Sequence, residues 1–180
     1  MCFIARKRGF ILITSVIFML VLTLVVVYAV RSATVYERVA GNNRNHSQAF
    51  QAAEYALAQA RGALVEEPPA VSASGCTGGA CPKSYDTSRF DSPAFWIANQ
   101  AATCAVNAAC NNRGANKVPV GTPASFPSAT GEQPRYVVRE LGTASPGGKS
   151  CNFYEITAFG QGSNAQSASI LRSVVKACDS

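Results

Sequence analysis

The chain has 180 residues, which is enough for one ordinary domain and hardly for two. It is 48% apolar and only 14% charged, and its formal net charge is +6. Three of the 16 basic residues form one cluster near the N-terminus, and the remaining 13 exceed the 10 acidic residues by only three. Because these charges are scattered and form no basic stripe, the composition gives no support for a specific nucleic-acid partner.

The first predicted element is a membrane helix. Residues 10–30 form a run of 21 residues without a charge, and 15 of them are Phe, Ile, Leu or Val. Insertion of such a run into a bilayer is favourable by roughly 5–9 kcal/mol, and its length fits a hydrocarbon core of about 30 Å. Arg6, Lys7 and Arg8 come directly before it. Since basic residues mark the cytoplasmic end of a membrane helix, we expect the N-terminus inside and the rest of the chain outside.

An ordinary cleaved signal peptide is the competing interpretation of this run. Such signals have a shorter apolar region of 7–15 residues, followed by small residues at the cleavage site. Here the run is longer, and it continues through Arg31 into a helical pattern without a small-residue site. The pattern therefore favours a retained helix.

Cysteine usage agrees with an external location. Cys2 lies in the basic leader, and six cysteines follow the membrane run: Cys76, Cys81, Cys104, Cys110, Cys151 and Cys178. An even set outside the membrane indicates three disulfides. We favour Cys76–Cys81, and also Cys151–Cys178, because Cys151 precedes one β-rich segment and Cys178 follows the next. Cys104–Cys110 is then left by elimination, although six cysteines allow 15 pairings. Zinc is the alternative for the two closely spaced pairs, but no matched set of four ligands is present.

Beyond the membrane run, the helical pattern continues as an amphipathic segment over residues 31–64. Apolar residues recur at spacings of three and four, and this predicts one buried helical face. That face comprises Phe50, Ala53, Leu57, Ala60 and Leu64. The stretch 41–47 is rich in Gly and Asn, which are poor helix formers. We expect the helix to be thinned or locally melted there, and a loop joining two helices is the alternative.

Residues 65–180 are predicted to form a loop-rich head. Residues 65–134 are mostly loop, with one short helix that has Ser92 as N-cap and Pro93 at its first position. Three β-rich segments follow, separated by Gly-rich and Pro-rich turns, and they predict an antiparallel meander. The segments are Tyr136–Leu141, Phe153–Gly160 and Ser169–Lys176. The fold class is therefore α+β, with a long N-terminal helix packed on a small antiparallel sheet.

No arrangement of residues in the sequence predicts catalysis. The single histidine, His46, has no recognisable Ser or Cys partner. Glu37 and Glu54 are 17 residues apart, or about 25 Å on a straight helix, which is too far for an acid/base pair. The Gly-rich segment 75–81 lacks the lysine of a phosphate loop. We therefore predict that the chain is not an enzyme and has no cofactor or metal.

Two motifs carry a resemblance to a known family. The segment Arg6-Lys7-Arg8-Gly9-Phe10, followed by the apolar run, resembles a class III (prepilin) signal. The segments ERVAGN (37–42) and AFQAAE (49–54) resemble the N-terminal signature of PilX-type minor pilins of type IV pili. The resemblance implies a type IV pilin-like fold. It also implies cleavage by a prepilin peptidase between Gly9 and Phe10, so that residues 1–9 are a leader, and methylation of Phe10.

The same resemblance implies a function in pilus assembly. Minor pilins of this type join other minor pilins, the major pilin and a tip adhesin at an inner-membrane assembly platform. They lie in the inner membrane of a Gram-negative-type envelope, surrounded by lipid, before they enter an extracellular filament used for adhesion and twitching motility. Major pilins carry Glu at the fifth mature position, where this chain has Thr14, and often a Pro where it has Arg31. These departures favour an initiating subunit at or near the tip.

Two other interpretations stay open at the level of the sequence. A pseudopilin of a type II secretion system shares the leader and the apolar helix. A bitopic periplasmic binding module would keep residues 10–30 as a permanent anchor. The state of the mature N-terminus separates the anchor from the pilin.

Overall fold

The computed structural model describes residues 8–66, 74–108, 110, 126–127, 132–145, 148, 150–164 and 166–178. The leader residues Cys2, Arg6 and Lys7, and a large part of the loop predicted over 65–134, lie outside the described residues. In chain order the elements are α1 (Arg8–Glu66), β1 (Ala80–Cys81), η1 (Thr87–Asp91), α2 (Pro93–Ala98), η2 (Gln100–Ala102), β2 (Cys104–Ala105), β3 (Arg135–Ala144), β4 (Cys151–Gln161) and β5 (Ala168–Cys178).

Helix α1 is continuous from Arg8 to Glu66. The Gly/Asn-rich stretch 41–47 is helical throughout, so the prediction of a melted segment or a loop is wrong for this structure. A few residues of low helix propensity cost about 1 kcal/mol each at most, and the cooperative helix on both sides outweighs that cost. The stretch does mark a boundary, because the chain divides into the units Met1–Asn43 and Arg44–Ser180.

Three long antiparallel strands form most of the sheet in the second unit, as predicted. Strand β4 pairs with β3 on one side and with β5 on the other, with Val138 opposite Ile156 and Ile156 opposite Ser173. Two short strands that the sequence did not predict add to the other edge of β3. Strand β2 is antiparallel to β3, whereas β1 is parallel to it, so the sheet is mixed.

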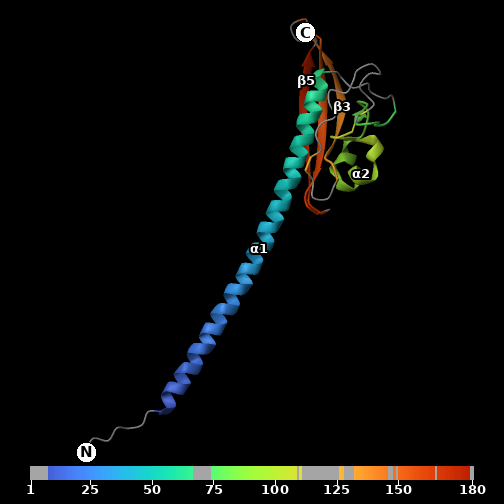
Figure 1. Cartoon of the computed structure of the whole chain (residues 1–180). Coiled ribbons are helices and arrows are strands. Elements are labelled where there is room, and N and C mark those ends of the chain that lie inside the picture. Colours follow the sequence, from blue (N-terminus) through green and yellow to red (C-terminus); the bar gives the residue numbers. More distant parts are fainter. Residues whose placement is uncertain are drawn as a thin grey trace, which may run out of the picture. The chain divides into compact units, whose positions relative to one another are not determined.

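One face of the sheet packs against the C-terminal part of α1 (Figure 1). The buried residues of the helix are almost all alanines with 0–1% exposure: Ala49, Ala52, Ala53, Ala56 and Ala60. Phe50 was predicted to be buried, but it is 42% exposed, and Leu57 is only partly buried. The buried stripe is shifted because the helix approaches the sheet too closely for large side chains.

Glycines of the sheet make this close approach possible. A Cβ atom on Gly160 of β4 would lie 2.3 Å from the Ala49 carbonyl oxygen and 2.3 Å from the Ala53 nitrogen. A Cβ on Gly162 would lie 2.3 Å from the Asn45 carbonyl oxygen. Real Cβ atoms do not come so close to backbone atoms, and therefore only glycine fits at either position.

The opposite face of the sheet is covered in part by η1 and α2, which gives three layers (Figure 1). Trp96 is fully buried and stacks on Phe159 of β4, with 5.5 Å between the ring centroids. Its indole N–H donates to the Phe90 carbonyl oxygen at 2.9 Å. Helix α2 begins at Pro93 after Ser92, as predicted, although the Ser92 side chain makes no capping hydrogen bond. The predicted α+β pilin-like arrangement is confirmed.

Candidate functional site: the apolar half of α1

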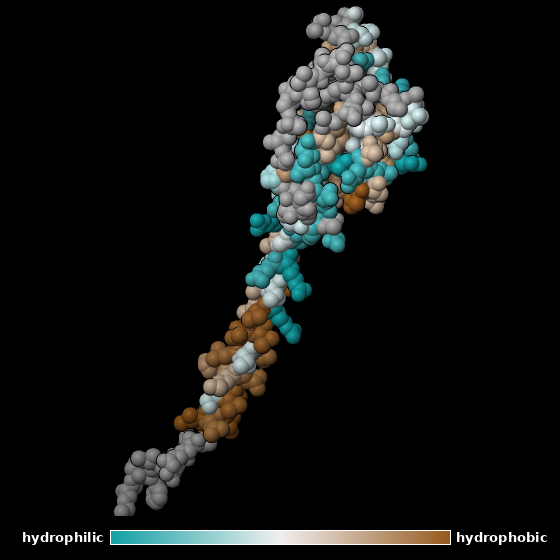
Figure 2. Space-filling model, turned by 45° about the vertical axis from the view of Figure 1, so that its right-hand side comes forward, coloured by the Kyte–Doolittle hydropathy of each residue, from teal (hydrophilic) through white to brown (hydrophobic). Residues whose placement is uncertain are grey.

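The largest apolar surface of the described chain lies on the first part of α1. The large apolar side chains between Phe10 and Val30 are 47–75% exposed. Figure 2 shows this segment as a continuous hydrophobic band on the helix. Among the described residues, α1 is the one helix that is long and apolar enough to cross a membrane. A surface of this kind is unstable in water and fits a membrane anchor.

The Thr and Ser side chains in this band are hydrogen-bonded to their own helix. The Thr14 hydroxyl donates to the carbonyl oxygens of Phe10 and Ile11, at 3.1 and 3.0 Å. Ser15 donates to the Leu12 carbonyl oxygen at 2.9 Å, and Thr23 donates to the Leu20 carbonyl oxygen at 2.8 Å. Hydroxyl donors that are satisfied within the helix carry little cost in lipid or in a helix bundle. The band therefore meets its surroundings mainly through apolar contacts.

The predicted processing junction lies at the start of this helix. Gly9 and Phe10 belong to the first turn of α1, which begins at Arg8. Thr14 lies one turn further on and is joined to Phe10 by its hydroxyl hydrogen bond. The structure therefore places the predicted methylation site and the position that lacks the usual acid next to each other. Their roles in cleavage and assembly stay predictions.

All six cysteines beyond the membrane run form disulfides in the second unit. The pairs are Cys76–Cys81, Cys104–Cys110 and Cys151–Cys178. These are the pairs favoured from the sequence, and each of these six sulfur atoms is bonded to another sulfur and not to zinc. Cys151 and Cys178 are partners in the register of β4 and β5, so their bond joins one end of the two strands.

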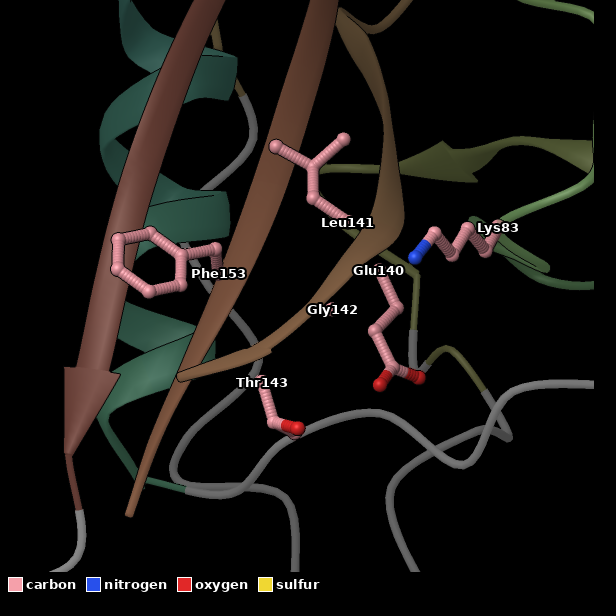
Figure 3. A pocket seen from close by; sticks show the side chains of 6 residues that line it. All are labelled: Lys83, Glu140, Leu141, Gly142, Thr143 and Phe153. Carbon is pink, nitrogen blue, oxygen red and sulfur yellow. The ribbon is translucent and has the colours of Figure 1, made fainter. Parts of the chain in front are cut away.

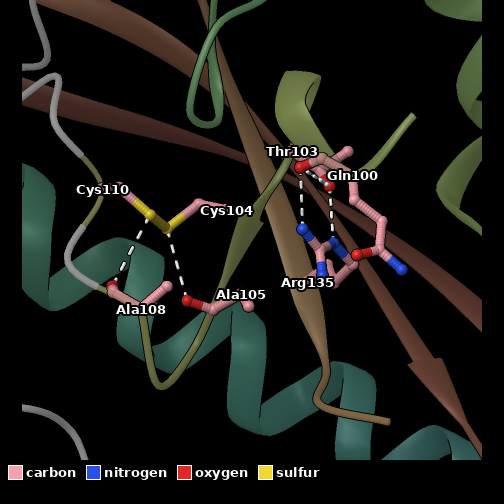
Figure 4. Close-up of a disulfide and its surroundings, with 7 residues drawn as sticks. All are labelled: Gln100, Thr103, Cys104, Ala105, Ala108, Cys110 and Arg135. Carbon is pink, nitrogen blue, oxygen red and sulfur yellow. Dashed lines mark hydrogen bonds between the residues drawn. A yellow bond between two sulfur atoms is a disulfide. The ribbon is translucent and has the colours of Figure 1, made fainter.

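The Cys104–Cys110 disulfide lies close to a partly buried arginine (Figure 4). Arg135 donates through Nε to the Thr103 hydroxyl oxygen at 2.6 Å and through Nη2 to the Gln100 carbonyl oxygen at 2.7 Å. Burial lowers the pKa of Arg135 from its ordinary value. An arginine with such a high ordinary pKa remains a cation. Its contacts hold η2 against the start of β3, which is a structural role.

An ion network on the face of the sheet that η1 covers was not predicted. Arg139 pairs with Glu155 across β3 and β4. The Arg172 Nη2 atom lies 2.6 Å from the Asp91 carboxylate and donates to the Thr87 carbonyl oxygen at 2.9 Å, which attaches η1 to β5. Arg139 and Glu155 are 16 residues apart, and Arg172 and Asp91 are 81 apart. Only the strand register brings such residues together, and the sequence alone does not specify it.

The residues considered for catalysis do not converge. His46 is exposed on α1, and Glu37 and Glu54 are exposed on the same helix. Within the described part of the chain, no three His, Cys, Asp or Glu side chains gather closely enough to hold a metal ion. The arrangement of the described residues provides an exposed apolar helix segment and a disulfide-bonded head.

Comparison with known families assigns both parts of the chain. The family model described as PilX N-terminal matches residues 8–58, which include the apolar band. The model described as type IV pilus assembly protein PilX C-term matches residues 73–177, which include all but the last residue of the described strands. Comparisons with curated proteins and with solved structures gave no match.

Proposed function

Since the chain belongs to the PilX family of type IV pilus assembly proteins, we propose that it is a minor pilin that helps to start filament assembly. Family membership implies that it works with other components of the type IV pilus. In this proposal it stays at or near the tip, beside other minor pilins, the major pilin and a tip adhesin. Its role is structural, and adhesion and twitching motility depend on the filament that it helps to start.

The observation that carries the proposal is the exposed apolar band at residues 10–30. A helix of this kind needs lipid or sister helices around it, because its large side chains are 47–75% exposed. In a helix bundle the same surface stays out of water, at about 25 cal/mol per Å² or several kcal/mol for the helix. The satisfied hydroxyls of Thr14, Ser15 and Thr23 allow the exchange without breaking a hydrogen bond. The band can therefore leave the inner membrane and enter a filament.

Processing of the N-terminus is the second part of the proposal. A prepilin peptidase cuts between Gly9 and Phe10 and methylates Phe10, and the leader with its basic cluster Arg6, Lys7 and Arg8 is lost. The junction Gly9–Phe10 lies in the first turn of α1, where the helix has the fewest internal hydrogen bonds and opens most easily. Before the cut, the basic cluster holds the N-terminus on the cytoplasmic side.

The lack of an acid at Thr14 supports a position at the filament tip. In major pilins, the acid at this position is thought to meet the N-terminal amine of the subunit ahead, and Thr14 has no charge to offer. Its hydroxyl is occupied by the Phe10 and Ile11 carbonyl oxygens of its own helix. A subunit without the acid suits a place where no subunit precedes it.

A deletion strain complemented with a tagged copy of the gene tests assembly and processing together. We expect loss of surface filaments with the major pilin still produced, and restoration by the wild-type gene. Mass spectrometry of the complementing protein should find a methylated Phe10 as its first residue. A mature chain that starts at Met1 would instead support a permanent anchor. Loss of type II secretion with normal piliation would support a pseudopilin.

Substitution at Thr14 tests the tip position. Thr14→Glu should spread the subunit along the filament, because the new acid can meet the amine of a preceding subunit. Thr14→Val is the matched control, since it keeps the branched shape and removes only a hydroxyl that is bonded to its own helix. Immunogold labelling should show Thr14→Val at filament ends only. Labelling of wild-type subunits along the whole shaft would contradict the tip position.

A further inference from the structure

Within the described part of the head, one sheet edge is only partly paired. Strand β2 pairs with the edge of β3 at Arg135 and Tyr136, and β1 pairs with the same edge at Val138 and Arg139. No strand among the described residues pairs with that same edge from Glu140 to Ala144. On its other side β3 continues to pair with β4 as far as Ala144. An ordered strand with one free edge can accept a further strand.

Two local features explain why the pairing of β1 with β3 stops at Arg139. Strand β1 ends at Cys81, and the next residue, Pro82, has no N–H group with which to continue the pairing. Strand β3 also contains a bulge between Glu140 and Gly142. Gly142 has a φ of +143°, which a side chain rarely allows. The bulge turns the end of β3 away from the course that β1 follows.

A hollow lies beside this uncovered edge. Its volume is about 660 Å³, and it is lined by Lys83, Glu140, Leu141, Gly142, Thr143 and Phe153. Figure 3 shows these side chains around the free end of β3, with Phe153 coming from the neighbouring strand. Leu141 and Phe153 are only partly buried. The hollow therefore offers both unpaired main chain and apolar side chains.

The charges of the hollow restrict what it can accept. The ammonium group of Lys83 lies 3.3 Å from the place where a Gly142 Cβ would stand, directly over the uncovered strand. Among the described residues Lys83 forms no ion pair, and its side chain is exposed. Lys176, which lies opposite Phe153 in β5, is a second exposed cation on the same side of the sheet. Glu140 also lines the hollow, so its charge is mixed, and an acid on an entering strand would pair with Lys83.

The same lysine disfavours a second copy of this chain. Lysines and bulges on a sheet edge both discourage pairing between identical edges. The edge is thus selective. It favours a strand that brings an acid to Lys83 over a strand that brings another lysine.

We propose that the edge Glu140–Ala144 binds an extended segment of another pilus subunit, with apolar residues facing Leu141 and Phe153 and an Asp or Glu facing Lys83. Main-chain hydrogen bonds hold the segment, and the apolar contacts and the Lys83 ion pair select it. This inference rests on the proposed function, because it requires the chain to meet other subunits in a filament.

Photo-crosslinking in intact cells tests the proposal. A photoreactive amino acid replaces Thr143, which lines the hollow, and in a control it replaces Ala94, which is exposed on α2. Filaments are sheared from the cells and irradiated, and the linked peptides are sequenced. We expect a link from position 143, but not from position 94, to a segment of another pilus subunit that alternates apolar residues and contains an acid. A link to a second copy, a link within the chain, or no link overturns the inference.

Reversing the charge of Lys83 provides a second test of the proposal. Lys83→Glu should reduce the yield of this link at least tenfold, whereas Lys83→Arg should retain it. Both side chains would be exposed, and Trp96 fluorescence checks that the head is folded. An unchanged yield with Lys83→Glu overturns the role of the ion pair. Filaments that contain the processed chain but give no link overturn the inference and leave the proposed function intact. An uncut chain that never enters filaments overturns both.

Discussion

The two parts of α1 use apolar residues in opposite ways. Between residues 10 and 30 the large side chains Phe, Ile, Leu and Val are exposed on the helix surface. Between residues 49 and 60 the buried positions are alanines, each with an exposure of 0–1%. One continuous helix therefore has a part that is built for an external partner and a part that is built for its own sheet.

This difference shows that the size of the side chains on α1 depends on how closely the backbone of the packing partner approaches the helix. The sheet supplies Gly160 and Gly162 where α1 passes, so the two backbones nearly touch and only small helix residues fit. Lipid chains and sister helices adapt to the surface that they meet, and large side chains gain the most free energy there. If hydrophobicity alone decided burial, the large Phe, Ile, Leu and Val side chains would be buried and the alanines would be exposed. Substitutions that act on one part and spare the other test this comparison.

The largest expected effect is the loss of the Cys151–Cys178 disulfide. Replacing both residues by Ser should lower the free energy of unfolding of the head by about 3–4 kcal/mol, because a closed loop of 27 residues no longer restricts the unfolded chain. Urea unfolding of the full chain in detergent, followed by Trp96 fluorescence, measures the change. The far-UV helical signal that survives head unfolding should not change, since residues 10–30 contain no cysteine. A loss of that signal would contradict the independence of the two parts.

Gly160→Ala should have the next largest effect. The added Cβ would lie 2.3 Å from backbone atoms of α1, and the helix must move away from the sheet. Overpacking of this kind costs about 3 kcal/mol. Gly62→Ala is the control, because Gly62 lies in α1 and nothing lies within 4 Å of its added Cβ. The control should stabilise the head by up to about 1 kcal/mol. Equal effects of the two substitutions in urea unfolding would show that close packing is not responsible.

Ala56→Leu tests the alanine stripe itself. Ala56 is fully buried in the cluster with Ile156 and Ala158, and the larger side chain should lower the unfolding free energy by about 2 kcal/mol. Ala58→Leu is the control, because Ala58 is exposed on the same helix. We expect almost no change there, as both residues are good helix formers. A stabilising effect of Ala56→Leu would mean that the helix and sheet have room between them.

Much of the architecture could be predicted because it depends on local pattern. The run at 10–30, the Ser92-Pro93 helix start and the three β-rich segments each carry their signal within a few residues. The disulfide pairs could be favoured from their spacing and from the strand positions of Cys151 and Cys178. The buried stripe could not be predicted, because Phe50 is the more hydrophobic choice and only Gly160 and Gly162 reveal the narrow gap. The hollow beside Glu140 depends on a bulge and on the end of a two-residue strand, and neither has a clear sequence pattern.

The smallest effect on the head should come from Leu24→Ala in the apolar band. Leu24 is 62% exposed on a part of α1 that belongs to the other unit, so the urea midpoint of the head should stay within experimental error. The same substitution weakens the apolar driving force for membrane insertion by roughly 0.5 kcal/mol. In a filament, where sister helices would bury this leucine, the loss should be larger, about 2 kcal/mol or more. Fewer filaments with normal membrane levels of the subunit is therefore the expected phenotype, and it can be measured by shearing and immunoblotting. If the head of this variant unfolded at a lower urea concentration while filaments stayed normal, Leu24 would stabilise the chain's own fold. The division of α1 into an external and an internal part would then be wrong.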